Sequence, residues 1–300
     1  MLRHTFQHIP GLGERRERAL WRRGIYTWDA LLAAPQRSGL PATVLREAQA
    51  IIALSQEALR QGNIYFFAQL LPVREHWRLY GDFHEMTAYL DIETGPLGHG
   101  RQGITVIGLF DGQEFRSFVY GDNLHAFEQY LRRYDLLVTF NGKTFDLPLI
   151  ERDLGIPIYQ AQIDMKVFLH YLGYRGGLKR IERQWGIIRE DEIAGLTGFD
   201  AVLLWARYRR GDPEALKRLI AYNRADVVNL EILLKRGYEL ACSQIEAAVC
   251  GEARRSSLPL FSGESGGGGG SHVRIRPPPG PLLPREGTIA EGSCETASQG

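Results

Sequence analysis

Four acidic residues that lie far apart in the chain have sequence settings unlike those of ordinary surface acids. Asp91 and Glu93 end a strand-like apolar run. Asp146 follows Phe145 at the start of a helical pattern, and Asp226 lies within a second helical pattern. Carboxylates gathered from distant segments repel one another, so a fold tolerates them best around a bound cation. Because oxygen ligands suit hard divalent ions such as Mg²⁺ or Mn²⁺, the four acids predict a metal site.

The spacing of these residues places them in pairs on common faces. Residues two apart on a strand point the same way, so Asp91 and Glu93 share one face. Tyr222 and Asp226 are four apart in a helical pattern and lie one turn apart on one face. Each motif also has a purely structural interpretation, such as a dipole-favoured acid at a helix start for Asp146. Taken together, the motifs favour a functional site.

An α/β domain over residues 85–245 is predicted to position these acids, because strand-like and helical patterns alternate there. Thr94 and Gly95 are expected to end the first strand and turn the chain away. Asp164 is expected to cap a helix that begins at Met165. The strands are expected at 87–91, 104–110, 114–120, 136–140 and 156–164. The helices are expected at 124–134, 145–154, 178–185, 199–208 and 213–241.

The first part of the chain predicts a small all-α module, residues 1–62, joined to the α/β domain by a packing segment, residues 63–84. Helices are expected at 14–23, after a Thr27 cap, and at 43–61. The hairpin sequence Ile9-Pro10-Gly11-Leu12-Gly13 resembles a helix-hairpin-helix motif. That resemblance implies phosphate contact through Gly11 and Gly13, whereas a plain structural turn is the alternative. Nearby arginines, partly offset by Glu14 and Glu17, add positive charge: Arg15, Arg16, Arg18, Arg22 and Arg23.

The composition is typical of a globular protein with a reducing environment. Hydrophobic residues make up 44% of the chain, charged residues 24%, and the formal net charge is +1, so any nucleic-acid binding must come from a local patch. The three cysteines form no metal or disulfide pattern, and a signal peptide and a membrane span are not expected, which favours the cytoplasm. Residues 251–300 are rich in Gly, Ser and Pro and are expected to be a disordered tail.

The motifs together resemble those of the DEDD exonuclease superfamily, the DnaQ-like proofreading group with a ribonuclease-H-like fold. Asp91-Ile92-Glu93-Thr94 resembles its first motif, the segment from Asn141 to Pro148 its second, and Tyr222-x-x-x-Asp226 its third, in the tyrosine form. Within it, the YprB-type ribonuclease-H-like family is the most similar group, on the strength of Gly177-Leu178-Lys179-Arg180-Ile181-Glu182 and of the residues from Tyr222 to Leu230. The resemblance covers residues 85–240 and implies a mixed five-stranded sheet flanked by helices.

The resemblance also implies a mechanism with two Mg²⁺ or Mn²⁺ ions. Asp91 would bridge both ions, Glu93 and Asp226 would bind on the nucleophile side, and Asp146 would act through water on the other ion. Tyr222 would orient the attacking water, because a tyrosine is too weak an acid to be an efficient base. For Phe145 the sequence favours core packing over stacking on a base. The candidates for substrate contact are Thr94, Asn141, Lys143, Phe145 and Lys179.

The leading hypothesis is therefore a nuclease that releases nucleotides from a 3′ end. Two alternatives remain open, a structure-specific endonuclease on the same fold and a catalytically silent nucleic-acid-binding or scaffold protein. The four acids argue against the silent module, because a silent descendant need not keep repelling carboxylates. The expected partner is DNA or RNA with a free 3′ end, no membrane is expected, and the sequence allows no inference of a protein partner.

Overall fold

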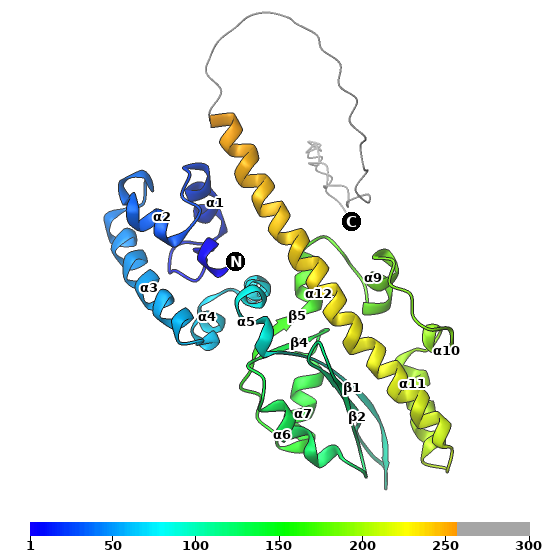
Figure 1. Cartoon of the computed structure of the whole chain (residues 1–300). Coiled ribbons are helices and arrows are strands. Elements are labelled where there is room, and N and C mark those ends of the chain that lie inside the picture. Colours follow the sequence, from blue (N-terminus) through cyan, green and yellow to red (C-terminus); the bar gives the residue numbers. More distant parts are fainter. Residues whose placement is uncertain (257–300) are drawn as a thin grey trace, which may run out of the picture. The chain divides into compact units, whose positions relative to one another are not determined.

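A mixed five-stranded sheet with the order β3-β2-β1-β4-β5 organises the chain, which a computed structural model describes over residues 1–256 (Figure 1). β1 pairs antiparallel with β2 and parallel with β4. β2 pairs antiparallel with β3, and β4 pairs parallel with β5, so the predicted mixed α/β sheet is confirmed. The strands are β1 (Thr87–Gly98), β2 (Arg101–Phe110), β3 (Phe115–Val119), β4 (Leu136–Thr139) and β5 (Ala161–Asp164).

The first strand is longer than the sequence indicated. β1 continues through Thr94 and Gly95 to Gly98, so the expected strand end at Thr94 and Gly95 is wrong. A register shift against β2 falls between Glu93 and Thr94, because Glu93 faces Val106 and Thr94 faces Ile104, which leaves Thr105 of β2 without a directly opposed residue. Gly95 is needed for packing, because a Cβ there would lie 3.0 Å from Cδ1 of Trp205.

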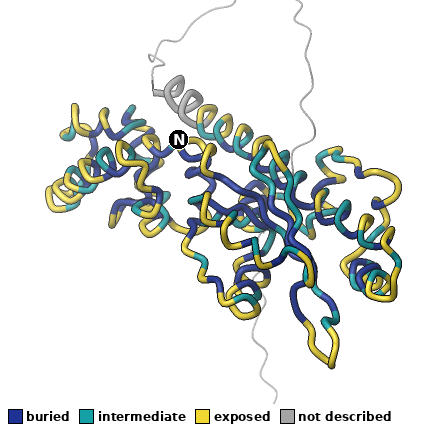
Figure 2. Tube along the Cα trace, turned by 60° about the horizontal axis from the view of Figure 1, so that its bottom comes forward, coloured by how far each residue is buried: buried dark blue, intermediate teal, exposed yellow. Residues whose placement is uncertain are grey.

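Helices cover both faces of the sheet, whose central strands are largely buried (Figure 2). Because side chains alternate along a strand, neighbouring residues face opposite layers. Ala88, Leu90 and Ile92 of β1 pack in a core with α6 (Phe127–Leu131) and α7 (Asp146–Leu154). The intervening Tyr89 belongs to the core on the other face, where α12 (Pro213–Ser256) packs against β1 and β2. Asp91 and Glu93 follow Tyr89 at two-residue steps, so the sheet carries them to the α12 face.

The remaining helices complete the domain with some differences from expectation. In place of the helix expected at 124–134, the chain forms a 3₁₀ turn, Leu124–Ala126, followed by the short α6. The strand β5 is shorter than the expected 156–164. α12 extends well past residue 241, so residues 251–256 are helical, and the predicted tail beyond them lies outside the described residues. No helix in the described chain combines the length and apolar composition that crossing a bilayer requires. The others are α8 (Met165–Tyr171), α9 (Leu178–Gln184), α10 (Asp191–Ala194) and α11 (Gly198–Tyr208).

The N-terminal region is helical throughout, as predicted. Thr27 caps α2 by accepting the backbone N–H of Ala30 at 3.2 Å. In the glycine hairpin, Gly11 has φ +76° and Gly13 is the N-cap of α1. The element that precedes the hairpin is the 3₁₀ turn η1 and not a full helix. The elements are η1 (Leu2–His4), α1 (Glu14–Arg22), α2 (Trp28–Ala33), η2 (Pro35–Arg37), α3 (Ala42–Arg60), α4 (Ile64–Leu70), η3 (Val73–Leu79), α5 (Tyr80–Phe83) and η4 (His84–Met86).

A buried ion network fastens α1 to η3. Glu17 is 1% exposed and accepts hydrogen bonds from the Thr5 hydroxyl at 2.7 Å and the Phe6 backbone N–H at 2.6 Å. Arg78 donates to Glu17 at 3.2 Å and to Glu75 at 2.8 Å. Glu17 therefore does not offset the surface arginines of α1, as the sequence suggested, because its charge is paired in the interior.

The buried His8 makes the N-terminal region sensitive to acid. Its Nε2 contacts the Ser55 hydroxyl oxygen at 3.0 Å, while its Nδ1 is buried without a partner in the described chain. Ser55 donates its own proton to the Ile51 carbonyl at 2.7 Å, so Nε2–H must be the donor to Ser55. A second proton on Nδ1 would have no acceptor, and burial accordingly lowers the pKa of His8 from 6.5 to about 3.

Acidification should therefore destabilise the protein through His8. Below pH 6.5 the unfolded chain binds the proton first, so stability is lost as the pH falls from 6.5 toward 3, by about 2 kcal/mol between pH 7 and pH 5. His8→Gln stays neutral and can still donate to Ser55. Urea unfolding of both proteins at the two pH values should show a smaller acid loss in the variant, and equal losses would exclude His8 as the cause.

Candidate metal centre

Three carboxylates from two distant segments converge at one place. Asp91 and Glu93 of β1 and Asp226 of α12 each offer an oxygen, and the three oxygens lie within 4.8 Å of one another. Glu93 and Asp226 are buried, whereas Asp91 is partly exposed. The three acids line a pocket of about 340 Å³. The pocket therefore combines a hard-oxygen ligand set with access for a substrate.

The electrostatics of the cluster favour a cation. Burial, followed by repulsion from the neighbouring carboxylates, raises the pKa of Asp91 and of Glu93 well above the usual range. Burial also raises the pKa of Asp226, although Arg189 opposes this rise. Each raised pKa means that negative charge is costly here without a positive partner. The donor set fits a divalent ion such as Mg²⁺, which would be held by Asp91, Glu93 and Asp226.

Asp146 is adjacent to this cluster but outside the set of three. It stands in the first turn of α7, is 4% exposed, and accepts the backbone N–H of Ile92 at 3.2 Å. Its carboxylate thus braces β1 between the two acids of that strand. Burial raises the pKa of Asp146 to about 7, against the lowering effect of its backbone hydrogen bonds.

Tyr222 lines the same pocket as the three acids, one turn before Asp226, and Lys179 fixes its hydroxyl. Lys179 Nζ donates to Tyr222 Oη at 2.6 Å, also donates to the Leu196 carbonyl, and lies 4.2 Å from the centre of the tyrosine ring. Lys179 was predicted as a substrate contact, and its ammonium, which has three protons, donates to Tyr222 and to Leu196. Because Lys179 fills one lone pair of the phenol oxygen, the phenol proton is free to point elsewhere.

Sequence reasoning missed Arg189, which the structure places directly on Asp226. Arg189 follows α9, its side chain is 4% exposed, and it donates to Asp226 and, through two nitrogens, to Glu182 at 2.8 and 2.6 Å. Asn229 of α12 donates to the same Glu182 at 2.9 Å. Neither periodicity nor spacing in the sequence indicates a role for Arg189. Its partner Glu182, however, ends the Gly177–Glu182 motif. This buried network joins α9 to the helix that carries Asp226.

Asn223 is a second missed residue of the site. Its side-chain amide donates to Asp91 twice, to the carboxylate at 3.0 Å and to the backbone carbonyl at 3.2 Å. Gly108 of β2 makes room for it, because a Cβ there would lie 2.0 Å from the Asn223 Oδ1. Its position beside Tyr222 in the third motif was the available signal. Asn223 thus locks β1 to α12 at the point where the acids meet.

The other predicted substrate contacts lie in four different places. Thr94 and Phe145 line the pocket of the three acids, and Phe145 is 48% exposed, so core packing is wrong for it. Asn141 is in a turn with φ +65°, and its side chain accepts from Lys166 at 3.1 Å. Lys143 lines a different hollow, beside β5. Gly11 and Gly13 are in the N-terminal hairpin and do not line the pocket of the three acids.

Comparison with known proteins agrees with the fold. A family model described as the RNase H superfamily matches residues 88–238. Curated proteins give no match. Similar solved structures include the family B DNA polymerase of the archaeon Pyrobaculum calidifontis, with 18% identity, a TM-score of 0.37, and coverage of 50% of this chain and 23% of the polymerase.

Two further structures are similar over larger shares of their own length. The Nibbler EXO domain of Aedes aegypti has 12% identity and a TM-score of 0.40, with coverage of 59% of this chain and 91% of the domain. RNase D of Escherichia coli, an exoribonuclease involved in structured RNA processing, has 19% identity and a TM-score of 0.36. The match covers 62% of this chain and 49% of RNase D.

Proposed function

Because the chain belongs to the RNase H superfamily, we propose that it is a nuclease whose acidic cluster holds divalent metal ions and hydrolyses phosphodiester bonds. One observation carries this proposal: Asp91, Glu93 and Asp226 bring oxygens within 4.8 Å of one another in an accessible pocket. Mg²⁺ and Mn²⁺ suit these ligands. The proposal includes two ions, with Asp146 serving the second through water.

The chain's own residues would orient the reacting groups. Bound divalent ions supply an activated water and stabilise charge on the leaving oxygen. Asn223 holds the Asp91 carboxylate in place from α12, and Arg189 holds Asp226. Tyr222 would donate its free phenol proton to the attacking water, because Lys179 already donates to its oxygen. Burial and the nearby carboxylates raise the pKa of Tyr222, so it stays protonated and orients the water without acting as a base.

The direction of cleavage is proposed as 3′ to 5′, on the resemblance of the third motif to the tyrosine form. Digestion of 5′-labelled single-stranded DNA and RNA with Mn²⁺ tests it. A ladder that shortens from the 3′ end supports the exonuclease, whereas discrete internal products support the endonuclease alternative. If the protein binds both nucleic acids but cleaves neither of them in Mn²⁺ or in Mg²⁺, the proposed function is wrong and a catalytically silent binding protein is favoured.

Tyr222→Phe should slow hydrolysis by about ten- to a hundredfold while metal binding stays unchanged. The ring keeps its packing, but the hydroxyl that orients the water is lost. Titration of Mn²⁺ by calorimetry, together with kcat on a labelled oligonucleotide, separates the two effects. An unchanged kcat would remove Tyr222 from the mechanism, and a weakened metal affinity would give it a structural role instead.

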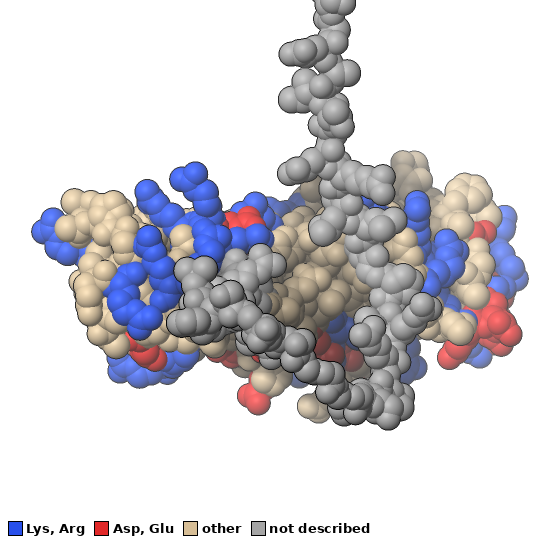
Figure 3. All heavy atoms as spheres, turned by 90° about the horizontal axis from the view of Figure 1, so that it is seen from above, with Lys and Arg blue, Asp and Glu red and all other residues tan. Residues whose placement is uncertain are grey.

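The N-terminal hairpin is proposed to contact phosphates of the same nucleic acid. Figure 3 shows Lys and Arg side chains over the N-terminal helices, and several arginines of α1 are exposed. Arg16 already donates to the Gly11 carbonyl at 2.6 Å, which stabilises the hairpin. Binding of duplex and single-stranded DNA at rising salt tests this contact, because a surface that uses phosphates loses affinity as salt rises. A salt-independent affinity would contradict it.

A further inference from the structure

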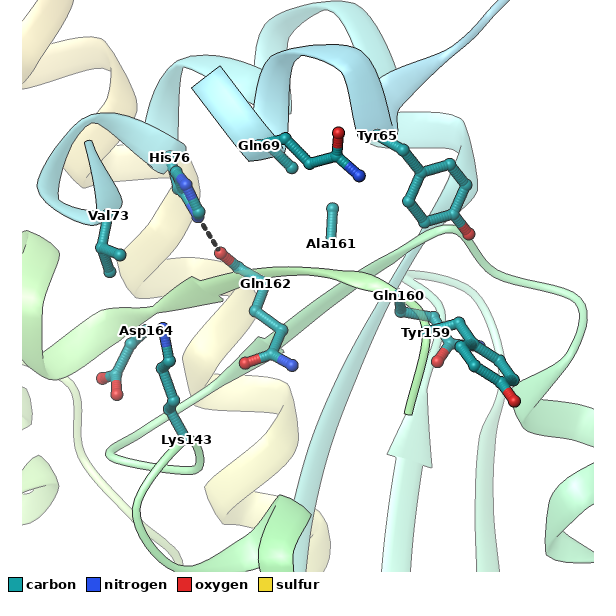
Figure 4. Close-up of a pocket in the computed structure, with 11 residues that line it drawn as sticks. Tyr65, Gln69, Val73, His76, Lys143, Tyr159, Gln160, Ala161, Gln162 and Asp164 are labelled. Atoms are coloured by element: carbon teal, nitrogen blue, oxygen red, sulfur yellow. Dashed lines mark hydrogen bonds between the residues drawn. The ribbon is translucent and has the colours of Figure 1, made fainter. Parts of the chain in front are cut away.

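A second hollow lies along the edge strand β5, separate from the catalytic pocket (Figure 4). This β5 groove has a volume of about 250 Å³ and runs between β5 and the segment formed by α4 and η3. Tyr65 and Tyr159 lie at one end of it, and Lys143 lies at the other. A hollow of this size is below the roughly 300–1,000 Å³ of sites for whole drug-sized ligands, so it suits one or two flat groups.

We propose that the β5 groove binds single-stranded nucleotides of the nucleic acid whose end occupies the catalytic pocket. This inference rests on the proposed nuclease function and adds a substrate class to it, a strand with unpaired bases beyond the site of cleavage. Three features of the groove support it: its aromatic rings, its unpaired amides, and its position beside the catalytic pocket.

Two tyrosine rings offer surfaces for base stacking. Tyr65 is 38% exposed, and its hydroxyl donates to the Asp135 carboxylate at 3.2 Å, which fixes the ring at the groove. Tyr159 is 65% exposed, and the Arg132 guanidinium lies 5.3 Å from its ring centre. Exposed rings held in fixed positions stack on any base, so they favour single strands without reading their sequence.

Three glutamines add hydrogen-bonding groups that the protein itself leaves unused. The side-chain amides of Gln69 and Gln162 have no partner among residues 1–256, and both line the groove. Gln160 is 7% exposed; its amide nitrogen donates to the Leu131 carbonyl at 3.3 Å, while its Oε1 is buried without a partner in the described chain. An unpaired buried acceptor is costly, and a donor on a base edge would satisfy it.

A peptide strand is a poorer occupant, although edge strands often accept one. The Gln162 carbonyl of β5 already accepts from His76 Nδ1 at 2.8 Å. The other ring nitrogen of His76 contacts the Leu71 carbonyl at 3.2 Å, so η3 is held against the edge of the sheet. Because that carbonyl is occupied and η3 lies alongside, an added strand would not find the free backbone groups of β5 that it needs for hydrogen bonding. Flat bases need only the rings and amides.

The position of the groove links it to the catalytic pocket. Lys143 lines the groove, and Phe145, two residues further along the same turn, lines the pocket. A strand that leaves the pocket past Phe145 therefore meets Lys143 next. Asp164 shares this end of the groove, and its carboxylate accepts backbone N–H groups of Asn141 and Lys166 at 3.0 and 2.9 Å. With one lysine facing one acid, stacking and not phosphate attraction should dominate binding in the groove.

The test compares oligonucleotides of increasing length, from 2 to about 12 nucleotides, with Ca²⁺ in place of Mg²⁺ so that binding is measured without cleavage. Fluorescence anisotropy of labelled oligonucleotides should show affinity rising with length in the full chain. Tyr159→Ala should weaken binding of the long oligonucleotides at least about fivefold, the lower bound for one stacked base, and leave the dinucleotide unaffected. Tyr159→Phe should restore the long-oligonucleotide affinity, because it keeps the ring. Tyr171→Ala, at a tyrosine that is 39% exposed and does not line the groove, is the control.

The outcomes separate this inference from the proposed function. If Tyr159→Ala and the unchanged protein bind long oligonucleotides with equal affinity, the proposed binding in the groove is wrong, even if hydrolysis is normal. An equal loss for the dinucleotide and the long oligonucleotides would also overturn it, because the residue would then act at the catalytic pocket. Length-dependent binding that Tyr159→Ala abolishes, in a protein that cleaves nothing, would support the groove and reject the nuclease.

Discussion

Asp91→Asn should abolish hydrolysis and leave the melting temperature in excess EDTA unchanged or higher. Asparagine has almost the same shape as aspartate, so packing is kept while one charge leaves the cluster. Asp91 faces repulsion from Asp226, Glu93 and Asp146, in addition to the cost of its burial, and both raise its pKa. Removing that charge lowers the electrostatic repulsion in the folded, metal-free protein. The same charge is needed to hold a divalent ion, so the ion and the activity are lost together.

The measurement uses one preparation for two readouts at pH 8. Melting curves are recorded in EDTA and in an excess of Mg²⁺, and nuclease activity is assayed on the same sample. Mg²⁺ should raise the melting temperature of the unchanged protein and have a much smaller effect on Asp91→Asn. Asp122→Asn, at an exposed turn, is the control and should change neither readout. A large drop for Asp91→Asn in EDTA would mean that Asp91 is a structural residue, held by Asn223.

The parts of the fold that could be predicted from the sequence depend on local patterns. Short strand-like runs bounded by turn residues indicated all five strands, and side-chain caps marked helix starts at Thr27 and Asp164. The strand-and-helix placement of Asp91, Glu93 and Asp226 follows from the same local rules. These rules apply over a few neighbouring residues, which is why they gave the type of each element better than its ends.

The parts that could not be predicted depend on contacts between distant residues. β1 continues past Thr94 because β2 pairs with it and Trp205 packs over Gly95, and neither partner is visible within the strand's own sequence. Phe145 resembles a core residue by type, yet the α7 start turns it to the rim of the pocket. Arg189 lies in a loop, and the direction of a loop side chain cannot be predicted from the periodicity of the sequence. Its role emerges only when α9 and α12 are placed side by side.

Arg189→Met should destabilise the protein by about 3–5 kcal/mol, the cost of removing one partner from a buried ion pair. The guanidinium is the positive group shared by Asp226 and Glu182, and its side chain is only 4% exposed. Methionine fills much of the volume but leaves two buried carboxylates to face each other. Urea unfolding in EDTA measures the loss. Arg236→Met is the control, because Arg236 is exposed and contacts the neighbouring Trp185 carbonyl, and it should stay within about 0.5 kcal/mol.

Two further measurements show whether Arg189 acts on the metal centre or only on the fold. Arg189→Met combined with Glu182→Gln removes both charges of the α9 pair, so stability should recover in large part. Mg²⁺ should then raise the melting temperature of Arg189→Met by more than that of the unchanged protein, because the ion would supply to Asp226 the positive charge that Arg189 supplied. An equal Mg²⁺ effect in the two proteins would mean that Arg189 holds α9 to α12 without influencing the charge that the acidic cluster presents to a metal. A weaker Mg²⁺ effect would instead mean that Asp226 needs the guanidinium to reach the position from which it binds.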